Sequence, residues 1–254
     1  MLYAAKSHIG LVRRMNQDGY IIVPDLVAGE LFLVADGMGG PSAGDVASQL
    51  AVEHVSSYIK EHDDAENDPS DVLLAAIHHA NEAIYEKAMG NSSYHGMGTT
   101  IVCALADAQQ IHFAHVGDSR AYLMTPDGDL RQVTRDHSLV AELVRRGQLT
   151  EDEAKVHPQR NIVTRSLGTE PRSMPDVNSV PWHPGDVILL CSDGLTNLVQ
   201  DAELSQFLRR AQSSRDMADL GLVVDEMINL ALERGGSDNV TALIAVHREE
   251  RDEC

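Results

Sequence analysis

Residues 31–37 read LFLVADG, a run of five apolar residues that ends on Asp36 and a glycine. The run has the length of a buried strand and is too short for a typical helix. A second run of this kind, VILLCSDG, occupies residues 187–194 and ends on Asp193 and a glycine. The glycine permits a sharp turn that brings a backbone carbonyl close to whatever the aspartate holds. A carboxylate beside a free carbonyl is suited to a hard cation such as Mg²⁺ or Mn²⁺.

A third aspartate, Asp238, has a similar setting in the segment GGSDN, just before the apolar run at residues 242–246. Hydrolysis at phosphorus needs neutralised phosphoryl oxygens and a nucleophile that is available near pH 7. Two divalent ions about 4 Å apart supply both, because they can hold a hydroxide between them. One carboxylate would bridge the ions and others would complete their shells. The candidates are Asp36, Asp193 and Asp238.

A phosphate-binding residue is offered by Arg13, which lies close to Asp18 in the segment GLVRRMNQD at residues 10–18. A guanidinium matches phosphate oxygens in bidentate fashion. An isolated Asp-Gly pair is more often a simple turn than a metal site. The hypothesis therefore depends on several motifs occurring together.

Composition restricts the class of protein. The 254 residues are 43% hydrophobic and 4% aromatic, which indicates one domain with a large aliphatic core. The formal net charge of −19 disfavours nucleic acid and anionic membrane as partners. Cys191 lies within an apolar run and the three cysteines are odd in number, so we expect reduced thiols. The N-terminus lacks a signal-peptide pattern and no run reaches transmembrane length, which leads us to expect a cytoplasmic protein.

The apolar spacing predicts both strands and helices. Strand-like runs lie near residues 2–5, 20–23, 31–35, 98–106, 110–116, 120–124, 187–191 and 241–246. Helical spacing covers residues 43–55, 73–84 and 217–232, and Thr150 opens a capping box at the start of a short helix. The strands cluster in the middle of the chain while the helices form separate blocks. This arrangement indicates the α+β class.

Seven short motifs follow one another through almost the whole chain. They are GLVRRMNQD at 10–18, VADGMGG at 34–40, MGTT at 97–100, HVGDSRAY at 115–122, VTRDHSL at 133–139, GDVILLCSDGL at 185–195 and GSDNVT at 236–241. Each motif is weak by itself. In this order they resemble the metal-dependent protein phosphatases of type 2C in their compact bacterial form.

The resemblance implies a four-layer α/β/β/α sandwich, in which two antiparallel sheets are flanked by helices and the metals lie at one end between the sheets. It implies a single catalytic domain at residues 1–247 and a mobile flap at about residues 145–168 beside the site. Residues 248–254 are expected to form a flexible tail.

The resemblance also assigns the ligands of the two core ions. Asp36 matches the aspartate that bridges both ions, and Gly37 gives its carbonyl to the second ion. Asp193 and Asp238 match the remaining ligands of the first ion. Asp18 matches an acidic residue that holds the second ion through water.

Further roles follow from the same comparison. Arg13 matches the phosphate-binding arginine, and Asp118 matches a ligand of a third, weaker ion that also uses Asp193. Asn161 falls where another ligand of the third ion sometimes occurs. The catalytic residues would be Arg13, Asp36 and Asp193. A hydroxide between the core Mn²⁺ or Mg²⁺ ions would attack phosphorus in line, with no phosphoenzyme.

The implied substrates are proteins that carry phosphoserine or phosphothreonine, and the implied biological role is to oppose a bacterial serine/threonine kinase. We expect a monomer. Two alternatives stay open. One is a non-catalytic regulator that binds phosphoproteins, although the three core aspartates are all present. The other is a phosphohydrolase of small molecules, because specificity would be set by the flap and surface grooves.

Three positions depart from the family pattern. His8 and Gln17 stand where an aspartate and a glutamate are common, and we expect only local hydrogen bonding to change. Pro41 stands where many bacterial members carry a histidine that is suspected of protonating the leaving oxygen. The general acid is therefore left unassigned.

Other chemistries fit less well. No Lys-Ser/Thr pair follows the glycines at residues 37–40, so a nucleotide-binding loop is disfavoured. Ser119 and Ser192 lack a Gly-x-Ser-x-Gly elbow, and no phosphate-binding loop follows Cys191. His115 and His137 are better interpreted as packed structural residues than as metal ligands.

Overall fold

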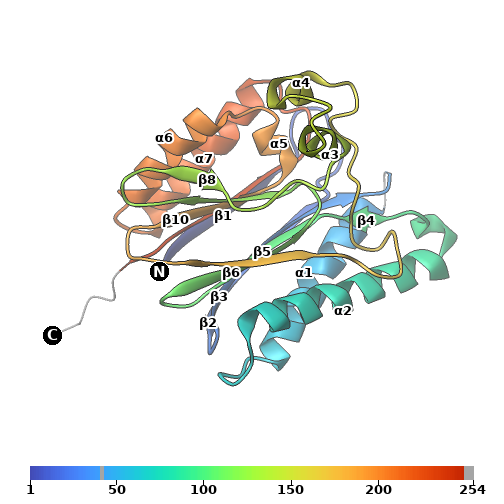
Figure 1. The fold of residues 1–254 in the computed structure, drawn as a ribbon, viewed down its shortest axis with the longest axis horizontal. Helices are drawn as coiled ribbons and strands as arrows, with labels where there is room; N and C mark the ends of the chain where they lie inside the picture. The colour runs from blue at the N-terminus through green and yellow to red at the C-terminus, as the bar shows by residue number, and fades with distance from the viewer. Residues whose placement is uncertain (41–42, 249–254) are drawn as a thin grey trace.

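Two antiparallel sheets pack face to face at the centre of the protein (Figure 1). The computed structural model describes residues 1–40 and 43–248. The first sheet contains, in spatial order, β1 (Leu2–His8), β11 (Val240–Val246), β10 (Val187–Cys191), β7 (Arg120–Met124) and β8 (Leu130–Gln132). The second contains β2 (Asp18–Leu26), β3 (Gly29–Met38), β5 (Ile101–Ala106), β6 (Gln110–Val116) and β9 (Asp176–Pro181), with β4 (Gly98–Thr99) paired to β3.

Helices cover the outer face of each sheet, which gives four layers (Figure 1). α1 (Gly44–Glu61) and α2 (Pro69–Gly90) pack on the second sheet, and α6 (Asp201–Gln212) and α7 (Met217–Glu233) pack on the first. Three apolar clusters fill the two helix–sheet interfaces and the space between the sheets. The expected α+β sandwich is confirmed.

The strand β3 shows why its sequence is a continuous apolar run. Phe32 and Val34 point into the space between the sheets, whereas Leu31, Leu33 and Ala35 pack under the helices α1 and α2. A strand that is covered on both faces needs apolar residues at every position, whereas a half-exposed strand alternates. The run therefore ends where β3 reaches the edge of the sandwich, at Asp36.

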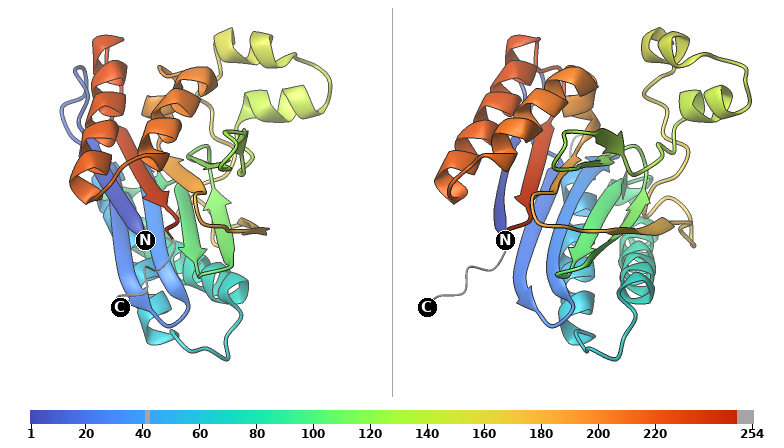
Figure 2. Two further views of the ribbon diagram at one scale, coloured as in Figure 1. Left: turned by 90° about the vertical axis from the view of Figure 1, so that its left-hand side faces the viewer. Right: turned by 60° about the vertical axis from the view of Figure 1, so that its left-hand side comes forward.

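The segment between β8 and β9 projects from the sandwich and carries two short helices, α3 (Leu139–Arg145) and α4 (Glu151–Val156) (Figure 2). Its two arms meet where Ser138 pairs with Val163. Thr150 precedes α4 and forms the predicted capping box. Its hydroxyl accepts from the backbone N–H of Glu153, and the Glu153 carboxylate accepts from the backbone N–H of Thr150. The remaining short elements are η1 (Ser92–Tyr94) and α5 (Asp193–Thr196).

The strand that the sequence predicts at residues 98–106 is interrupted at Thr100. The Thr100 hydroxyl accepts from the backbone N–H of Asp36 at 3.1 Å, so a side chain takes the place of a backbone acceptor in the ladder. The edge strands β8 and β9 and the helices α3 and α6 were not predicted. β9, for example, is mostly exposed and ends in a proline, so it lacks the apolar run that marks a buried strand.

Other expectations concern the termini and the thiols. Cys103 and Cys191 are free and buried, as expected. Among the residues that the structure describes, no helix is both long and apolar enough to cross a membrane. Most of the tail predicted at 248–254 lies outside the described residues, as does Pro41.

Candidate metal and phosphate site

Four aspartates from both sheets come together at one end of the sandwich. Asp36 lies near the end of β3 and Asp118 follows β6, both in the second sheet. Asp193 follows β10 and Asp238 precedes β11, both in the first sheet. Strand ends of two packed sheets meet at a shared edge, so aspartates that are far apart in the sequence face one cleft.

This cleft has a volume of about 630 Å³. It is lined by the four aspartates, by Arg13 and by the glycine-rich segment at residues 37–40. The projecting segment contributes Asn161 and Val163 to its lining. The cleft therefore contains every residue that the sequence nominated for the site except Asp18.

Asp18 lies behind the cleft in β2. One carboxylate oxygen, Oδ2, accepts hydrogen bonds from Ser192 Oγ at 2.8 Å and Thr241 Oγ1 at 2.6 Å. The other oxygen, Oδ1, is buried and has no protein partner. Burial raises the pKa of Asp18 to about 7, with Asp193 and Asp238 adding to the shift and the two hydroxyls opposing it. A buried oxygen without a partner is suited to a cation or to water bound to one.

The other carboxylates repel one another in the same way. Burial raises the pKa of Asp36 well above its ordinary value, and the nearby charges of Asp18 and Asp193 raise it further. The pKa of Asp118 is raised to about 7 by burial and then by Asp193. The pKa of Asp193 is also raised by burial, although a hydrogen bond from Asn197 Nδ2 at 3.0 Å lowers it. Such a group of carboxylates needs a positive charge to stay ionised near neutral pH.

Close backbone packing requires a glycine at position 37, directly after Asp36. A Cβ at Gly37 would overlap the backbone carbonyl of Gly44 at the start of α1 and would approach the carbonyl of Gln17. The backbone N–H of Gly37 donates to that Gln17 carbonyl at 3.1 Å. Glycine is therefore required for the end of β3 to pass between these segments.

Arg13 lies on the loop between β1 and β2, and its Nη2 donates to Asp238 Oδ2 at 2.7 Å. Asn239 shapes this loop, because its amide nitrogen donates to the carbonyls of Ile9 and Met15 and its amide oxygen accepts from the N–H of Gln17. The motif around Asp238 contains Asn239, but sequence analysis assigned it no role. Thr241 belongs to the same motif, and its role as a hydrogen-bond partner of Asp18 was not predicted either.

The two described departures from the family pattern make only local contacts. His8 Nδ1 accepts from the N–H of Gly10 at 2.9 Å. Gln17 Nε2 donates to the carbonyl of Gly40 at 2.8 Å. Neither side chain takes the place of a cleft carboxylate.

The donor set fits hard divalent cations. Aspartate carboxylates and backbone carbonyls are the ligands that Mg²⁺ and Mn²⁺ prefer, and the unpartnered oxygen of Asp18 leaves room for such an ion or its water. The cleft walls contain no cysteine or histidine among the described residues. A soft-metal site is disfavoured here.

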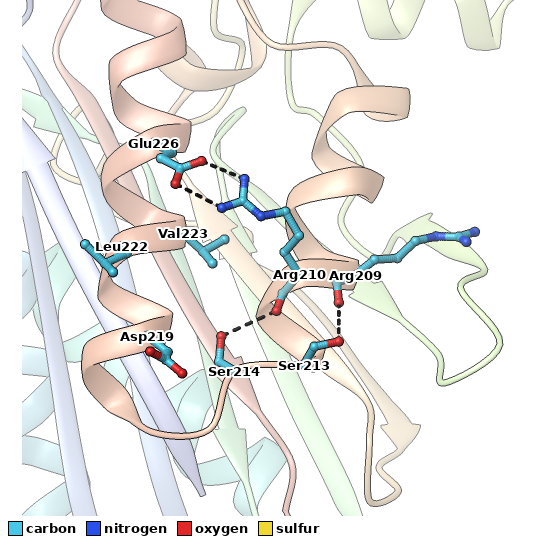
Figure 3. A pocket seen from close by; sticks show the side chains of 8 residues that line it. All are labelled: Arg209, Arg210, Ser213, Ser214, Asp219, Leu222, Val223 and Glu226. Atoms are coloured by element: carbon cyan, nitrogen blue, oxygen red, sulfur yellow. Dashed lines mark hydrogen bonds and ion pairs between the residues drawn. The ribbon is translucent and has the colours of Figure 1, made fainter.

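A second hollow, of about 430 Å³, lies between α6 and α7 (Figure 3). Three of its charged side chains, Arg210, Glu226 and Asp219, form ion pairs. Arg210 binds Glu226 through two hydrogen bonds of 2.6 and 2.9 Å, and Ser214 Oγ donates to the carbonyl of Arg210. Asp219 is likewise bound to Arg215 at 2.7 Å. Arg209 points away from the hollow (Figure 3) and donates to the Gly128 carbonyl at 3.4 Å. Since these charged groups are already bound, we assign no chemistry to this hollow.

Comparison with known proteins agrees with this geometry. The profile of the family described as Protein phosphatase 2C matches residues 6–227. The serine/threonine phosphatase stp of Listeria innocua is 39% identical over 245 residues, covering 92% of this chain and 91% of that protein. The protein phosphatase PhpP of Streptococcus pneumoniae is 36% identical over 249 residues, with coverages of 97% and 98%.

Solved structures give the same result. The serine/threonine phosphatase PstP/Ppp of Mycobacterium tuberculosis has a TM-score of 0.84 at 37% identity, over 97% of this chain and 98% of that one. The catalytic domain of a PstP in complex with two manganese ions has a TM-score of 0.82 at 35% identity, with the same coverages. The chain belongs to the protein phosphatase 2C family. It is a metal-dependent protein serine/threonine phosphatase.

Proposed function

We propose that the cleft is the catalytic site of this phosphatase and that its aspartates bind two core ions, Mn²⁺ or Mg²⁺. Asp36, Asp193 and Asp238 would hold the first ion. Asp36, the carbonyl of Gly37 and Asp18 would hold the second, with Asp18 acting through water. Asp118 and Asp193 would bind a third, weaker ion. The strongest support is the convergence of Asp36, Asp118, Asp193 and Asp238 on one cleft, with the buried Asp18 nearby. Burial raises the pKa values of Asp18, Asp36, Asp118 and Asp193.

The residues of the chain would share the work of the reaction. When bound, the divalent ions neutralise the phosphoryl oxygens and activate water for attack on phosphorus. Arg13, at the mouth of the cleft, would bind two phosphate oxygens and stabilise the charge that develops on them. Asn239 holds the Arg13 loop by hydrogen bonds to two carbonyls. Because no histidine lines the described part of the cleft, a water molecule would protonate the leaving oxygen.

The substrates would be proteins phosphorylated on serine or threonine by a bacterial serine/threonine kinase, which this enzyme would oppose in the cytoplasm. The net charge of −19 supports a protein substrate over nucleic acid. We propose that the enzyme acts as a monomer.

The deciding experiment is hydrolysis of a phosphothreonine peptide with Mn²⁺, with Mg²⁺ and with EDTA, using the wild-type protein and Asp193→Ala. We expect metal-dependent turnover that is lost in EDTA and in Asp193→Ala. Glu226→Gln, which breaks an exposed ion pair far from the cleft, is the control and should retain turnover.

Two results would contradict the proposal. Tight Mn²⁺ binding without turnover of any phosphopeptide would indicate a regulator or a narrower substrate such as a small phosphorylated metabolite. If calorimetry detects no metal binding, the cleft is not a metal site.

A further inference from the structure

A cluster of polar side chains lies outside the cleft, at the base of the projecting segment. It contains His115, His137 and Asp176, whose potential ligand atoms all lie within 4.8 Å of one another. The two imidazole rings stack at 4.7 Å between centroids with an angle of 20° between their planes. This is the spacing of a metal site, but the cluster already holds a cation.

That cation is Arg165. Its Nη1 donates to Asp176 Oδ1 at 3.0 Å and lies 3.3 Å from His137 Nε2. His115 Nε2 is bound to the backbone of Arg135, at 2.8 Å from its carbonyl. A guanidinium in this position repels a metal ion. The cluster is therefore better explained as a set of contacts within the chain.

His137 makes contacts in two directions. Its ring Nδ1 accepts from the backbone N–H of Gly117 at 3.1 Å. The backbone N–H of His137 donates to the Gly117 carbonyl at 2.9 Å. Because Nδ1 is an acceptor, the neutral ring carries its proton on Nε2, which faces Asp176 Oδ2 at 3.3 Å. One ring thus joins the turn that precedes Asp118 to the edge strand β9.

The same residue closes the projecting segment. The N–H of Thr164 donates to the His137 carbonyl at 2.8 Å, and the N–H of Leu139 donates to the Ile162 carbonyl at 2.9 Å. Arg165, which follows Thr164, reaches Asp176 from the returning arm. Both arms and the Asp118 turn therefore meet at one buried residue, His137, through its backbone and its ring.

We propose that His137 is a positioning residue that anchors the flap, residues 139–162, and the Asp118 turn through opposite edges of one ring. The Nε2 edge, with Asp176 and Arg165, holds the base of the flap. The Nδ1 edge holds Gly117, whose φ is +110° and where a Cβ would overlap the Thr100 side chain, so that the turn requires glycine at this position. The consequences for catalysis rest on the proposed function, whereas the anchoring itself does not.

Two substitutions separate the edges. In His137→Asn the amide oxygen can replace Nδ1 as the acceptor for Gly117, but nothing reaches Asp176. In His137→Gln the longer side chain can reach Asp176 but leaves Gly117 without its acceptor. Asp176→Asn removes the charge that binds Arg165. Because Asp176 is half-exposed, this substitution should disturb folding the least of the three. Glu226→Gln, which also removes one carboxylate from an arginine pair, is the matched control.

Hydrogen exchange of the flap backbone is the first measurement. In His137→Asn and Asp176→Asn we expect exchange in residues 139–162 to rise about tenfold, the effect of losing one charge-assisted hydrogen bond. Exchange in the control should match the wild type. Unchanged flap exchange in both variants would overturn the proposal.

Kinetics and metal titration are the second readout. In His137→Asn the KM for a phosphothreonine peptide should rise while kcat for p-nitrophenyl phosphate, which carries no peptide to contact the helices of the flap, stays within about twofold. In His137→Gln the weakest Mn²⁺ binding step should weaken while flap exchange stays near wild type. Equal effects of the two His137 variants on both readouts would show a merely structural residue. A wild-type protein without activity would defeat the proposed function, but the exchange result would still test the anchor.

Discussion

The carboxylate of Asp18 has one oxygen fully bonded and one without a partner. Ser192 and Thr241 satisfy the first oxygen, and the second is buried without a protein partner. The two oxygens of this side chain therefore have different roles: the hydroxyls orient the carboxylate through one oxygen and leave the other for a ligand. The role of Asp18 toward an ion stays a prediction.

Replacement of Asp18 by asparagine tests that interpretation. The amide oxygen can still accept from the two hydroxyls, while the charge that burial and neighbouring aspartates disfavour is gone. In EDTA at pH 8 we expect the Tm to rise by roughly 2–4 °C for each kcal/mol of repulsion that is removed. In Mn²⁺ the wild type should have the higher Tm, since the variant binds metal less tightly. A lower Tm in EDTA, measured by calorimetry, would mean that the carboxylate stabilises the metal-free protein.

Arg13 gives the second prediction at this scale. Loss of its charge-assisted hydrogen bonds in Arg13→Ala should lower kcat/KM for a phosphopeptide by roughly 10- to 150-fold, equivalent to about 1.5–3 kcal/mol. Arg13→Lys should recover only part of this loss, because an ammonium cannot bind phosphate in bidentate fashion. Arg209→Ala, an exposed change on α6, is the control. Full activity in Arg13→Ala would place phosphate binding elsewhere.

At the scale of the element, the buried side chain of Asn81 ties α2 to the segment that returns from the projecting helices to β9. Asn81 Oδ1 accepts from the N–H of Gly168 at 2.9 Å, and its Nδ2 donates to the Glu170 carbonyl at 3.1 Å. Asn81→Ala should therefore lower the free energy of unfolding by about 1–3 kcal/mol, the cost of unsatisfied buried groups. Glu82→Ala, on the exposed face of the same helix, should change it by less than about 0.5 kcal/mol. Equal denaturant midpoints for the two variants would contradict this link.

The elements also differ in how well their sequence predicts them. β6, β7 and β10 have the boundaries that their apolar runs predict, because both faces of each strand are buried. β9 was missed, since an exposed edge strand is held by backbone pairing to β6 and needs few apolar residues. α6 was missed because its buried stripe is narrow and consists of Leu204, Leu208 and Ala211.

At the scale of the whole molecule, the buried carboxylates make stability depend on pH. Asp18 and Asp118 have pKa values raised to about 7, and those of Asp36 and Asp193 are also raised, chiefly by burial. Between the ordinary carboxyl pKa near 4 and about pH 7, the folded state binds more protons than the unfolded state. Stability of the metal-free protein should therefore fall as the pH rises through this range.

Thermal unfolding in EDTA and in Mn²⁺ checks this expectation. The Tm in EDTA should decrease from pH 5 to pH 8. The increase in Tm on adding Mn²⁺ should be larger at pH 8, because the ions bind the ionised carboxylates. A Tm in EDTA that rises toward pH 8 would show that the carboxylates are not mutually destabilising.

The amino-acid sequence alone was enough to predict the α+β class, because the apolar runs and helical spacings record which segments are buried. It also placed the candidate aspartates at strand ends and Arg13 in a short motif before β2, whose roles stay predictions. Only the tertiary structure decided that Ser192 and Thr241 hold Asp18, and that His137 joins Gly117 to Asp176. Ser192 lies 174 residues from Asp18 along the chain. Such pairings follow from which strand ends meet when the two sheets pack, and no local pattern records that meeting.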